Sequence, residues 1–317
     1  IPLGTGARRF TIRKQWLRDA DRIALRDFWE SKHGPYGAFT CTMGFPFLSY
    51  EGPAQGIRNP QIMAQQYDKI KANRKMEGDA YWFFDSKSAV DKNWEKLKAQ
   101  NPQVLSIYLL DAENSGGKEG KGLSPEEAKA VVKKAHKAKI RVFAHVETAA
   151  DLALGLKLGV DGFANLPGAN WDGTGDAKRF ELADADLKKL AKKKTPVIPL
   201  FSHAQTGGSR TGAQQAQAKL FKRLLDAGVN VVIGSDDAQR TIRGELNYWF
   251  QFGDLNYPQI LKILCVNTPQ AIFPNRKIGR FEEGYEANFL VLNDNPFNNL
   301  LKLRAIAFKV KNGELLK

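Results

Sequence analysis

The segment IRVFAHVETAADLALGLKLGVDGFANLPG, which runs from Ile140 to Gly168, decides the fold of this chain. It begins with the apolar run Ile140–His145, which predicts a strand, and continues with the helical pattern Ala149–Leu158. The short run Asp161–Leu166 then predicts a second strand. A strand, a helix and a strand in this order indicate two parallel strands that are joined by a helical crossover.

The same alternation extends to both sides of this segment. Downstream, helices are expected at Asp184–Lys193 and Gly212–Ala227, and strands at Pro196–His203 and Val229–Asp236. Upstream, the expected elements are the strands Arg9–Arg13, Gly37–Thr42, Trp82–Phe84 and Gln103–Leu110 and the helices at Asp19–Lys32 and after Ser124-Pro125-Glu126-Glu127. Four or five consecutive strand-and-helix units predict an α/β fold, a (β/α)₈ TIM-like barrel. We expect one or more of its N-terminal strands to be displaced or missing.

The character of the chain changes after residue 266. Between Ile278 and Lys317, turn residues separate the apolar runs Phe289–Leu292 and Ala305–Val310. This pattern is typical of short strands. We therefore predict two domains, a barrel over residues 1–266 and a small C-terminal β-sandwich-like module over residues 267–317.

Composition excludes several classes of protein. With 43% hydrophobic residues the chain is not disordered, and two cysteines cannot form a disulfide scaffold or a four-cysteine zinc module. The sequence holds no apolar run long enough for a transmembrane helix. The net charge of +14 would suit a polyanion, but the lysines are spread out, so we expect no nucleic-acid partner. The start at Ile1 instead of Met is expected of an exported protein, periplasmic or at the cell surface.

Two residues at the ends of expected strands could carry chemistry. His145 and Asp236 each end a strand, and the carboxyl ends of barrel strands form the active face. Together they could bind a metal or act as a base and its orienting partner. Alternatively, His145 is a hydrogen-bonded structural residue and Asp236 caps a helix.

Three blocks of sequence resemble the amidohydrolase superfamily, in particular its imidazolonepropionase- and prolidase-like branch. The segment from Ile140 to Gly168 resembles the fifth and sixth strands of that family. Val231–Ala238, reading VVIGSDDA, resembles its eighth strand. Asn267–Pro296 resembles the segment that leads back into the small β-sandwich of the family.

This resemblance implies hydrolysis of amide or related bonds with one or two divalent metals. His145 matches the histidine of strand five and Asp236 the aspartate of strand eight, which binds metal and serves as the base. Asn165 stands at the position of the strand-six histidine, and Ser106 at that of the carboxylated lysine of strand four. The chain contains no His-x-His pair. Ser106 and Asn165 are thus degenerate ligand positions.

Two hypotheses from different classes follow. In the first, the chain is a degenerate, non-catalytic amidohydrolase-like protein without a cofactor, a binding or assembly component that meets protein partners or its own copies. In the second, it is an active hydrolase with an unusual mononuclear site that holds zinc or another divalent metal. His145 and Asp236 would then be the ligands and Asp236 the base. The expected substrate pocket adds Tyr108, His203, Asp237 and Arg240.

Overall fold

The structure is a computed structural model of the 317-residue chain. It describes residues 39–43, 82–84, 86–99, 102, 104–109, 123–169, 171, 176–201, 211–234, 245–246, 248–250 and 255–316. The expected strand Arg9–Arg13 and helix Asp19–Lys32 lie outside these residues.

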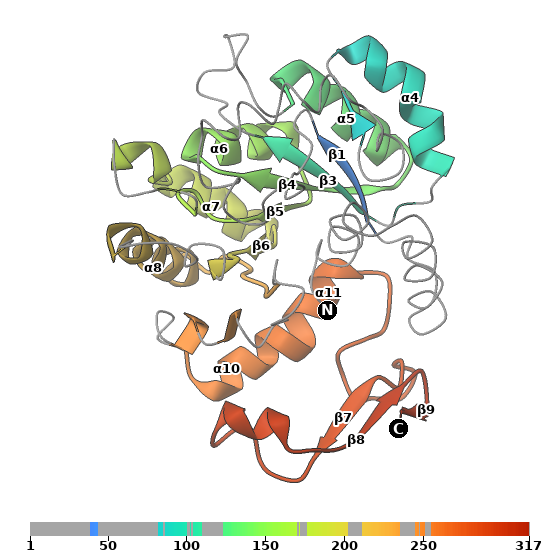
Figure 1. The fold of residues 1–317 in the computed structure, drawn as a ribbon, viewed down its shortest axis with the longest axis vertical. Coiled ribbons are helices and arrows are strands. Elements are labelled where there is room, and N and C mark those ends of the chain that lie inside the picture. The colour runs from blue at the N-terminus through green and yellow to red at the C-terminus, as the bar shows by residue number, and fades with distance from the viewer. Residues whose placement is uncertain are drawn as a thin grey trace, which may run out of the picture.

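A six-stranded parallel sheet forms the larger part of the fold (Figure 1). Its strands lie in the order β2-β1-β3-β4-β5-β6, so that from β3 onward neighbours in the sheet are also successive strands of the chain. Val231 adds a parallel bridge to Val197 beyond β6. The strands are β1 Phe39–Met43, β2 Trp82–Phe83, β3 Val104–Leu109, β4 Arg141–Val146, β5 Gly162–Ala164 and β6 Val197–Ile198. The α/β class with parallel strands is therefore confirmed.

Helices join the successive strands and lie along the outer side of the sheet (Figure 1). Two of them begin with a capping box, in which Ser124 pairs with Glu127 and Thr148 pairs with Asp151. The helices are α4 Lys87–Ala99, α5 Pro125–Lys137, α6 Ala149–Leu158, α7 Asp184–Lys193 and α8 Thr211–Asp226, with a short 3₁₀ helix at Ala177–Phe180.

The two faces of the parallel strands belong to two separate hydrophobic clusters. Leu105 and Ile107 of β3 pack in the large cluster that contains the helices, because alternate side chains of a strand point to opposite faces. Val104 belongs to the second cluster, which contains no residue of α4 to α8. The buried members of this second cluster are Val104, Phe143, Ile198, Leu200, Val232 and Ile272. Its residues form an inner layer, as expected for strands that are covered on both faces.

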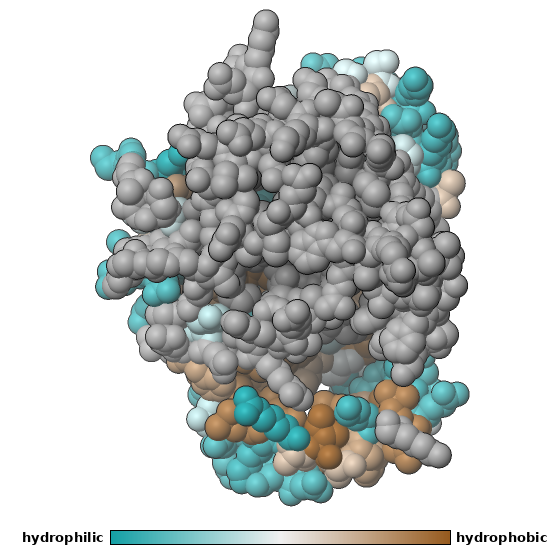
Figure 2. Space-filling model, viewed as in Figure 1, coloured by the Kyte–Doolittle hydropathy of each residue, from teal (hydrophilic) through white to brown (hydrophobic). Residues whose placement is uncertain are grey.

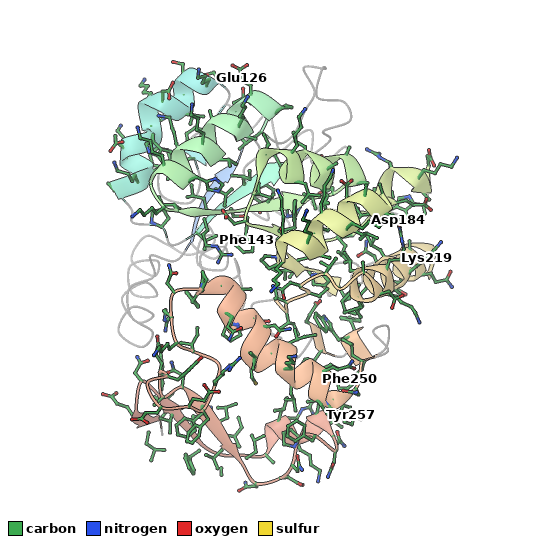
Figure 3. The ribbon with its side chains drawn as sticks, turned by 180° about the vertical axis from the view of Figure 1, so that it is seen from behind. Glu126, Phe143, Asp184, Lys219, Phe250 and Tyr257 are labelled. Atoms are coloured by element: carbon green, nitrogen blue, oxygen red, sulfur yellow. The ribbon has the colours of Figure 1, made fainter. Side chains whose placement is uncertain are left out.

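A second helical region packs against the inner layer. This region comprises α10 Tyr257–Lys262, a π-helical segment Ile263–Asn267 and α11 Thr268–Ile272. The guanidinium of Arg141 donates hydrogen bonds to the carbonyls of Ala271 and Ile272, where α11 ends. Burial lowers the pKa of Arg141. Phe143 lies two residues after Arg141 on β4, where the sheet faces this helical region (Figure 3).

Gly162 is required by the packing of the inner layer. A Cβ atom at this position would overlap the ring of Phe143 on the neighbouring strand. The ring therefore lies over the glycine backbone. The guanidinium of Arg141 stacks on the same ring, 5.0 Å from its centre.

The C-terminal region forms a separate antiparallel sheet (Figure 1). Its strands are β7 Phe289–Leu292, β8 Ile306–Lys311 and β9 Glu314–Leu316, with a 3₁₀ helix at Leu300–Arg304. None of the side chains of β7, β8 and β9 that the structure describes is buried. Figure 2 shows hydrophobic surface over this part of the molecule. The division at residues 266 and 267 stays a prediction, and the helical run Tyr257–Ile272 spans it.

Two expected strands are shorter than predicted because the backbone leaves the extended conformation. The strand expected over Pro196–His203 ends at Ile198, and Leu200 has a φ of 56°. The strand expected over Asp161–Leu166 ends at Ala164, and Asn165 has a φ of 70°. Such values interrupt a strand because extended residues require a negative φ. Of the strand expected over Val229–Asp236, the described part shows only the bridge at Val231.

Candidate ligand site at the ends of the parallel strands

Three side chains from neighbouring strands meet at the carboxyl edge of the sheet. Tyr108 of β3 lies opposite His145 of β4 in the register, and His145 lies opposite Ala164 of β5. Asn165 follows Ala164 directly. Because parallel strands present their carboxyl ends at one edge, residues that are distant in the sequence come together here. The structure thus unites three of the residues that the sequence singled out.

His145 is the centre of this group. Its side chain is only 4% exposed, and the ring of Tyr108 stacks on it with 4.5 Å between ring centres. The amide nitrogen of Asn165 lies 3.1 Å from Nδ1 and 3.2 Å from Nε2 of the imidazole. An amide N–H donates to an imidazole nitrogen only through the lone pair of that nitrogen. Where a ring nitrogen accepts this hydrogen bond, it uses the lone pair that a metal bound to the same nitrogen would need.

Asn165 reaches His145 because of its unusual backbone. Ala164 packs with the inner layer, so regular alternation would turn the next side chain outward. The φ of 70° at Asn165 reverses this and brings the amide to the imidazole. Its amide oxygen is buried and accepts no hydrogen bond from the described residues. Leaving a buried acceptor unpaired costs about 1–3 kcal/mol, so this atom is a feature to be explained.

Glu147 also belongs to this site, and we did not predict it from the sequence. Its Oε1 atom lies 3.7 Å from Nε2 of His145, and its side chain is 28% exposed. The fully buried carboxylate of Asp151 fixes the backbone here, since it accepts hydrogen bonds from the N–H groups of Glu147 and Thr148. The capping box of Thr148 and Asp151 predicts only that Glu147 directly precedes helix α6, and the distance to His145 is not contained in any local pattern.

Ser106 lies deeper in the sheet than the other site residues. It pairs with Phe143, two positions before Tyr108 and His145 in the register, and it is 6% exposed. Its hydroxyl replaces the amine that the resemblance expects. A serine cannot form the carbamate that would bridge two metals. Ser106 therefore lies inside the inner layer, where a bridging ligand would lie, but its hydroxyl cannot act as that ligand.

A buried glutamate stabilises the backbone just after the end of the next strand that the sequence predicted, β6. Glu245 is fully buried and accepts hydrogen bonds from the backbone N–H of Phe201, at 2.7 Å, and from the indole of Trp249, at 3.2 Å. Phe201 follows Leu200, whose left-handed backbone ends β6. Such a conformation in a bulky residue needs support from its surroundings. Glu245 supplies it from a segment more than forty residues downstream, which the sequence pattern did not reveal.

Four expected pocket or ligand residues lie outside the described part of the chain. They are His203, Asp236, Asp237 and Arg240. Their place in the site stays a prediction. Among the residues that the structure describes, no three His, Cys, Asp or Glu side chains form a group that could hold a metal ion. In the same residues, no helix is long and apolar enough to cross a membrane.

Comparison with known proteins gives relatives in sequence and in fold. The model of the Amidohydrolase family matches residues 183–316. Ochratoxinase from Aspergillus niger is 26% identical over 205 residues, which cover 61% of this chain and 42% of that protein. Over these stretches the chain is similar to the amidohydrolase superfamily. It spans less than half the length of the curated ochratoxinase.

Solved structures of several other proteins share the fold. The crystal structure of A. niger ochratoxinase has a TM-score of 0.66 and 17% identity, covering 92% of this chain and 69% of the other. Phenylurea hydrolase B has a TM-score of 0.65 and 14% identity, over 99% and 76%. A prolidase complexed with N-methylphosphonate-L-proline has a TM-score of 0.57 and 17% identity, over 74% and 59%. The parallel strands are therefore those of a TIM-like barrel.

The described donors of this chain do not fit a two-metal centre, although the Amidohydrolase family is usually metal-dependent. Ser106 cannot be carboxylated. Asn165 offers a neutral amide, a poor zinc ligand, and its nitrogen faces the imidazole. His145 and Glu147 then remain as one imidazole and one carboxylate, whereas zinc sites use at least three protein ligands.

Proposed function

We propose that this chain is a binding or assembly component built on an amidohydrolase scaffold, without two-metal hydrolysis. In this function the barrel mouth recognises a ligand that it does not cleave, and protein partners or further copies of the chain use the scaffold. The observation that carries the proposal is the contact between Asn165 and His145. An amide hydrogen bonded to the imidazole replaces a second imidazole that would ligate metal.

Ser106, which lies deeper in the sheet than this contact, supports the same proposal. Ser106 is buried in the inner layer and gives a hydroxyl at the level of Phe143. A metal-bridging carbamate needs a primary amine, so both altered positions remove strong ligands. The surrounding inner layer is nonetheless well packed. Under this proposal, the chain keeps the packed scaffold without the ligands that hydrolysis would need.

Metal content and turnover test the proposal together. The protein is incubated with Zn²⁺ or Mn²⁺, desalted and measured by elemental analysis, and it is then assayed on Xaa-Pro dipeptides, ochratoxin and a phenylurea. These substrates follow the names of its relatives. We expect far less than one ion per chain and no turnover. The His145→Ala variant should retain the same small amount of metal as wild type.

A matched variant controls for metal at the surface. The exposed imidazole of His136, which bonds to Asp161 at 2.9 Å, is removed in His136→Ala. We expect this change to remove any weakly held metal that His145→Ala leaves. A stoichiometry near one or two ions that His145→Ala abolishes, together with hydrolysis, would overturn the proposal.

One observation favours the second candidate function, an active hydrolase with a mononuclear site. Glu147 adds an anionic donor near His145, and Asp236 would supply a further carboxylate and the base. A divalent metal bound there would lower the pKa of its water and polarise the scissile carbonyl.

The second candidate function is tested at its carboxylates. Under it, Asp236→Asn and Glu147→Gln should each abolish turnover of a substrate that the wild type cleaves. Under the non-catalytic function, wild type and both variants are equally inactive. A substrate that wild type and Asp236→Asn cleave equally well would eliminate this candidate.

A further inference from the structure

We propose that lysines at the amino edge of the parallel sheet form a cationic surface that binds an anionic lipid membrane. This edge is opposite to the carboxyl edge, which carries Tyr108, His145 and Asn165. The inference therefore goes beyond the proposed function of the barrel mouth and does not depend on it. The surface, which we call the lysine edge, consists of Lys137, Lys139, Lys157, Lys192, Lys193 and Lys194.

The topology brings these lysines together from three separate parts of the sequence. In a parallel sheet, each crossover helix runs back from the carboxyl end of one strand to the amino end of the next. The last turns of α5, α6 and α7 therefore lie at the starts of β4, β5 and β6, which are neighbours in the sheet. Helix α6 contacts both α5 and α7 (Figure 1). Glu126 and Asp184 mark the opposite, first turns of α5 and α7 (Figure 3).

The charges of the lysine edge are exposed and lack partners within the described part of the chain. All of its side chains are exposed, and none of them forms a salt bridge with another described residue. Asp161 is the acidic residue at this edge, and its Oδ2 is occupied by Nε2 of His136 at 2.9 Å and the N–H of Val142 at 2.7 Å. Like charges that are gathered in this way repel one another and destabilise the fold.

Two of these lysines stand where glycine is favoured. Gly159 after α6 and Gly228 after α8 have φ values of 78° and 71°. Lys194 and Lys139 occupy the corresponding places after α7 and α5, with φ values of 52° and 59°. A side chain is strained in this left-handed conformation, whereas glycine is not. Lysines in the preceding turns already complement the helix dipoles. The charge at these two positions therefore costs the fold stability, which a function in binding explains.

The shape and the residue types of the lysine edge favour a lipid surface over a protein or a nucleic acid. The three turns between helix and strand are equally short and span residues 138–140, 159–161 and 194–196, so no long loop projects between the lysines. These turns and the helical turns before them contain no Trp, Tyr or Phe, the residues that anchor protein interfaces and stack on bases. Lysine is a point charge without the planar fork by which arginine recognises individual phosphates. An even array of lysines suits the diffuse charge of a membrane.

Co-sedimentation of the full chain with lipid vesicles tests the inference. Vesicles of phosphatidylcholine alone are compared with vesicles in which about one third of the lipid is phosphatidylglycerol, an anionic lipid. We expect the chain to sediment only with the anionic vesicles. It should be released at about 1 M salt, because the Debye length there is only about 3 Å.

Two glycine substitutions separate binding from folding. Lys139→Gly combined with Lys194→Gly removes two charges of the lysine edge and relieves the left-handed backbone. This double variant should bind the anionic vesicles about thirty-fold more weakly, since each lysine near a membrane contributes about five-fold in affinity. Its melting temperature should not fall. The matched control, Lys87→Gln with Lys309→Gln, removes the same charge from the first residue of α4 and from β8, and should bind as the wild type does.

Three outcomes would overturn the inference. The first is no sedimentation with the anionic vesicles at low salt. The second is an equal loss of affinity in both double variants, which would show that the net charge of +14 alone holds the chain to the lipid. The third is binding of duplex DNA that depends on Lys139 and Lys194 in a chain that leaves the vesicles unbound. None of these outcomes involves metal content or turnover at the barrel mouth, so the proposed function is tested separately.

Discussion

The parallel sheet and the C-terminal sheet use similar residues but bury them differently. All six residues of β3, reading VLSIYL, are buried. No residue of β8, reading IAFKVK, is buried. The parallel strands have helices on one side and the inner layer on the other, whereas the antiparallel sheet has large exposed side chains such as Leu290 and Leu315, at 51% and 64%. Burial is thus decided by the layers around a strand more than by its composition.

The largest expected effect contrasts one phenylalanine from each sheet. Phe143 is 3% exposed in the inner layer, and Phe308 of β8 is 42% exposed. Phe143→Ala should lower the free energy of unfolding by about 3–5 kcal/mol because it leaves a cavity. Phe308→Ala should change it by less than about 1 kcal/mol. Urea unfolding followed by tryptophan fluorescence measures both, and equal losses would contradict the comparison.

The next effect concerns Gly162, where the added methyl group meets Phe143. Gly162→Ala should cost about 1–3 kcal/mol through overpacking. Most of this loss should disappear when Gly162→Ala is combined with Phe143→Ala, as a double-mutant cycle measures. Gly313→Ala in the C-terminal sheet meets no atom within 4 Å, and its φ of 83° strains the backbone only. Its cost should therefore be independent of Phe143.

A smaller effect is expected at the helix caps of the two regions. Thr148→Ala removes the side-chain acceptor at the start of α6 and should cost about 1 kcal/mol in unfolding free energy. Asn299 caps only a short 3₁₀ helix in the C-terminal region. Asn299→Ala should cost less than Thr148→Ala in the same urea titration. The reverse order would show that the C-terminal region is the more cooperative of the two.

The smallest effect is a pH-dependent ion pair at the C-terminal region. The hydrogen bonds from Arg276 lower the pKa of the Glu286 carboxyl in the folded chain. The resulting stability is present above the unfolded pKa and is lost as pH falls through the folded one. Glu286→Gln should therefore cost less than about 1 kcal/mol at pH 7, because the pair is partly exposed. In strong acid, wild type and variant should have equal melting temperatures.

The sequence predicted the fold well where local signals and burial agree. Helices Ala149–Leu158 and Asp184–Lys193 and strand Phe289–Leu292 have the predicted bounds. Their hydrophobic periodicity and turn residues act over a few neighbours. The ends of β5 and β6 were missed because positive φ values at Asn165 and Leu200 depend on contacts with other strands. Only tertiary structure supplies those contacts.

The candidate site was predictable in part. His145, Tyr108 and Asn165 follow from strand ends and from the resemblance, and the structure brings them together. Glu147 was missed because a glutamate before a helix is common in solvent-exposed turns. Its role depends on the distance to His145, which no local pattern contains.

The left-handed backbone at Asn165 limits how this position can change in evolution. Asn, Asp and His adopt positive φ more readily than other side chains, and only Gly does so freely. A substitution between histidine and asparagine here leaves the conformation of the loop intact. A lineage could thus exchange a metal-binding side chain for an amide in one step, with no compensating change elsewhere in the chain. Exchange of this side chain and preservation of the scaffold would then have the same structural origin.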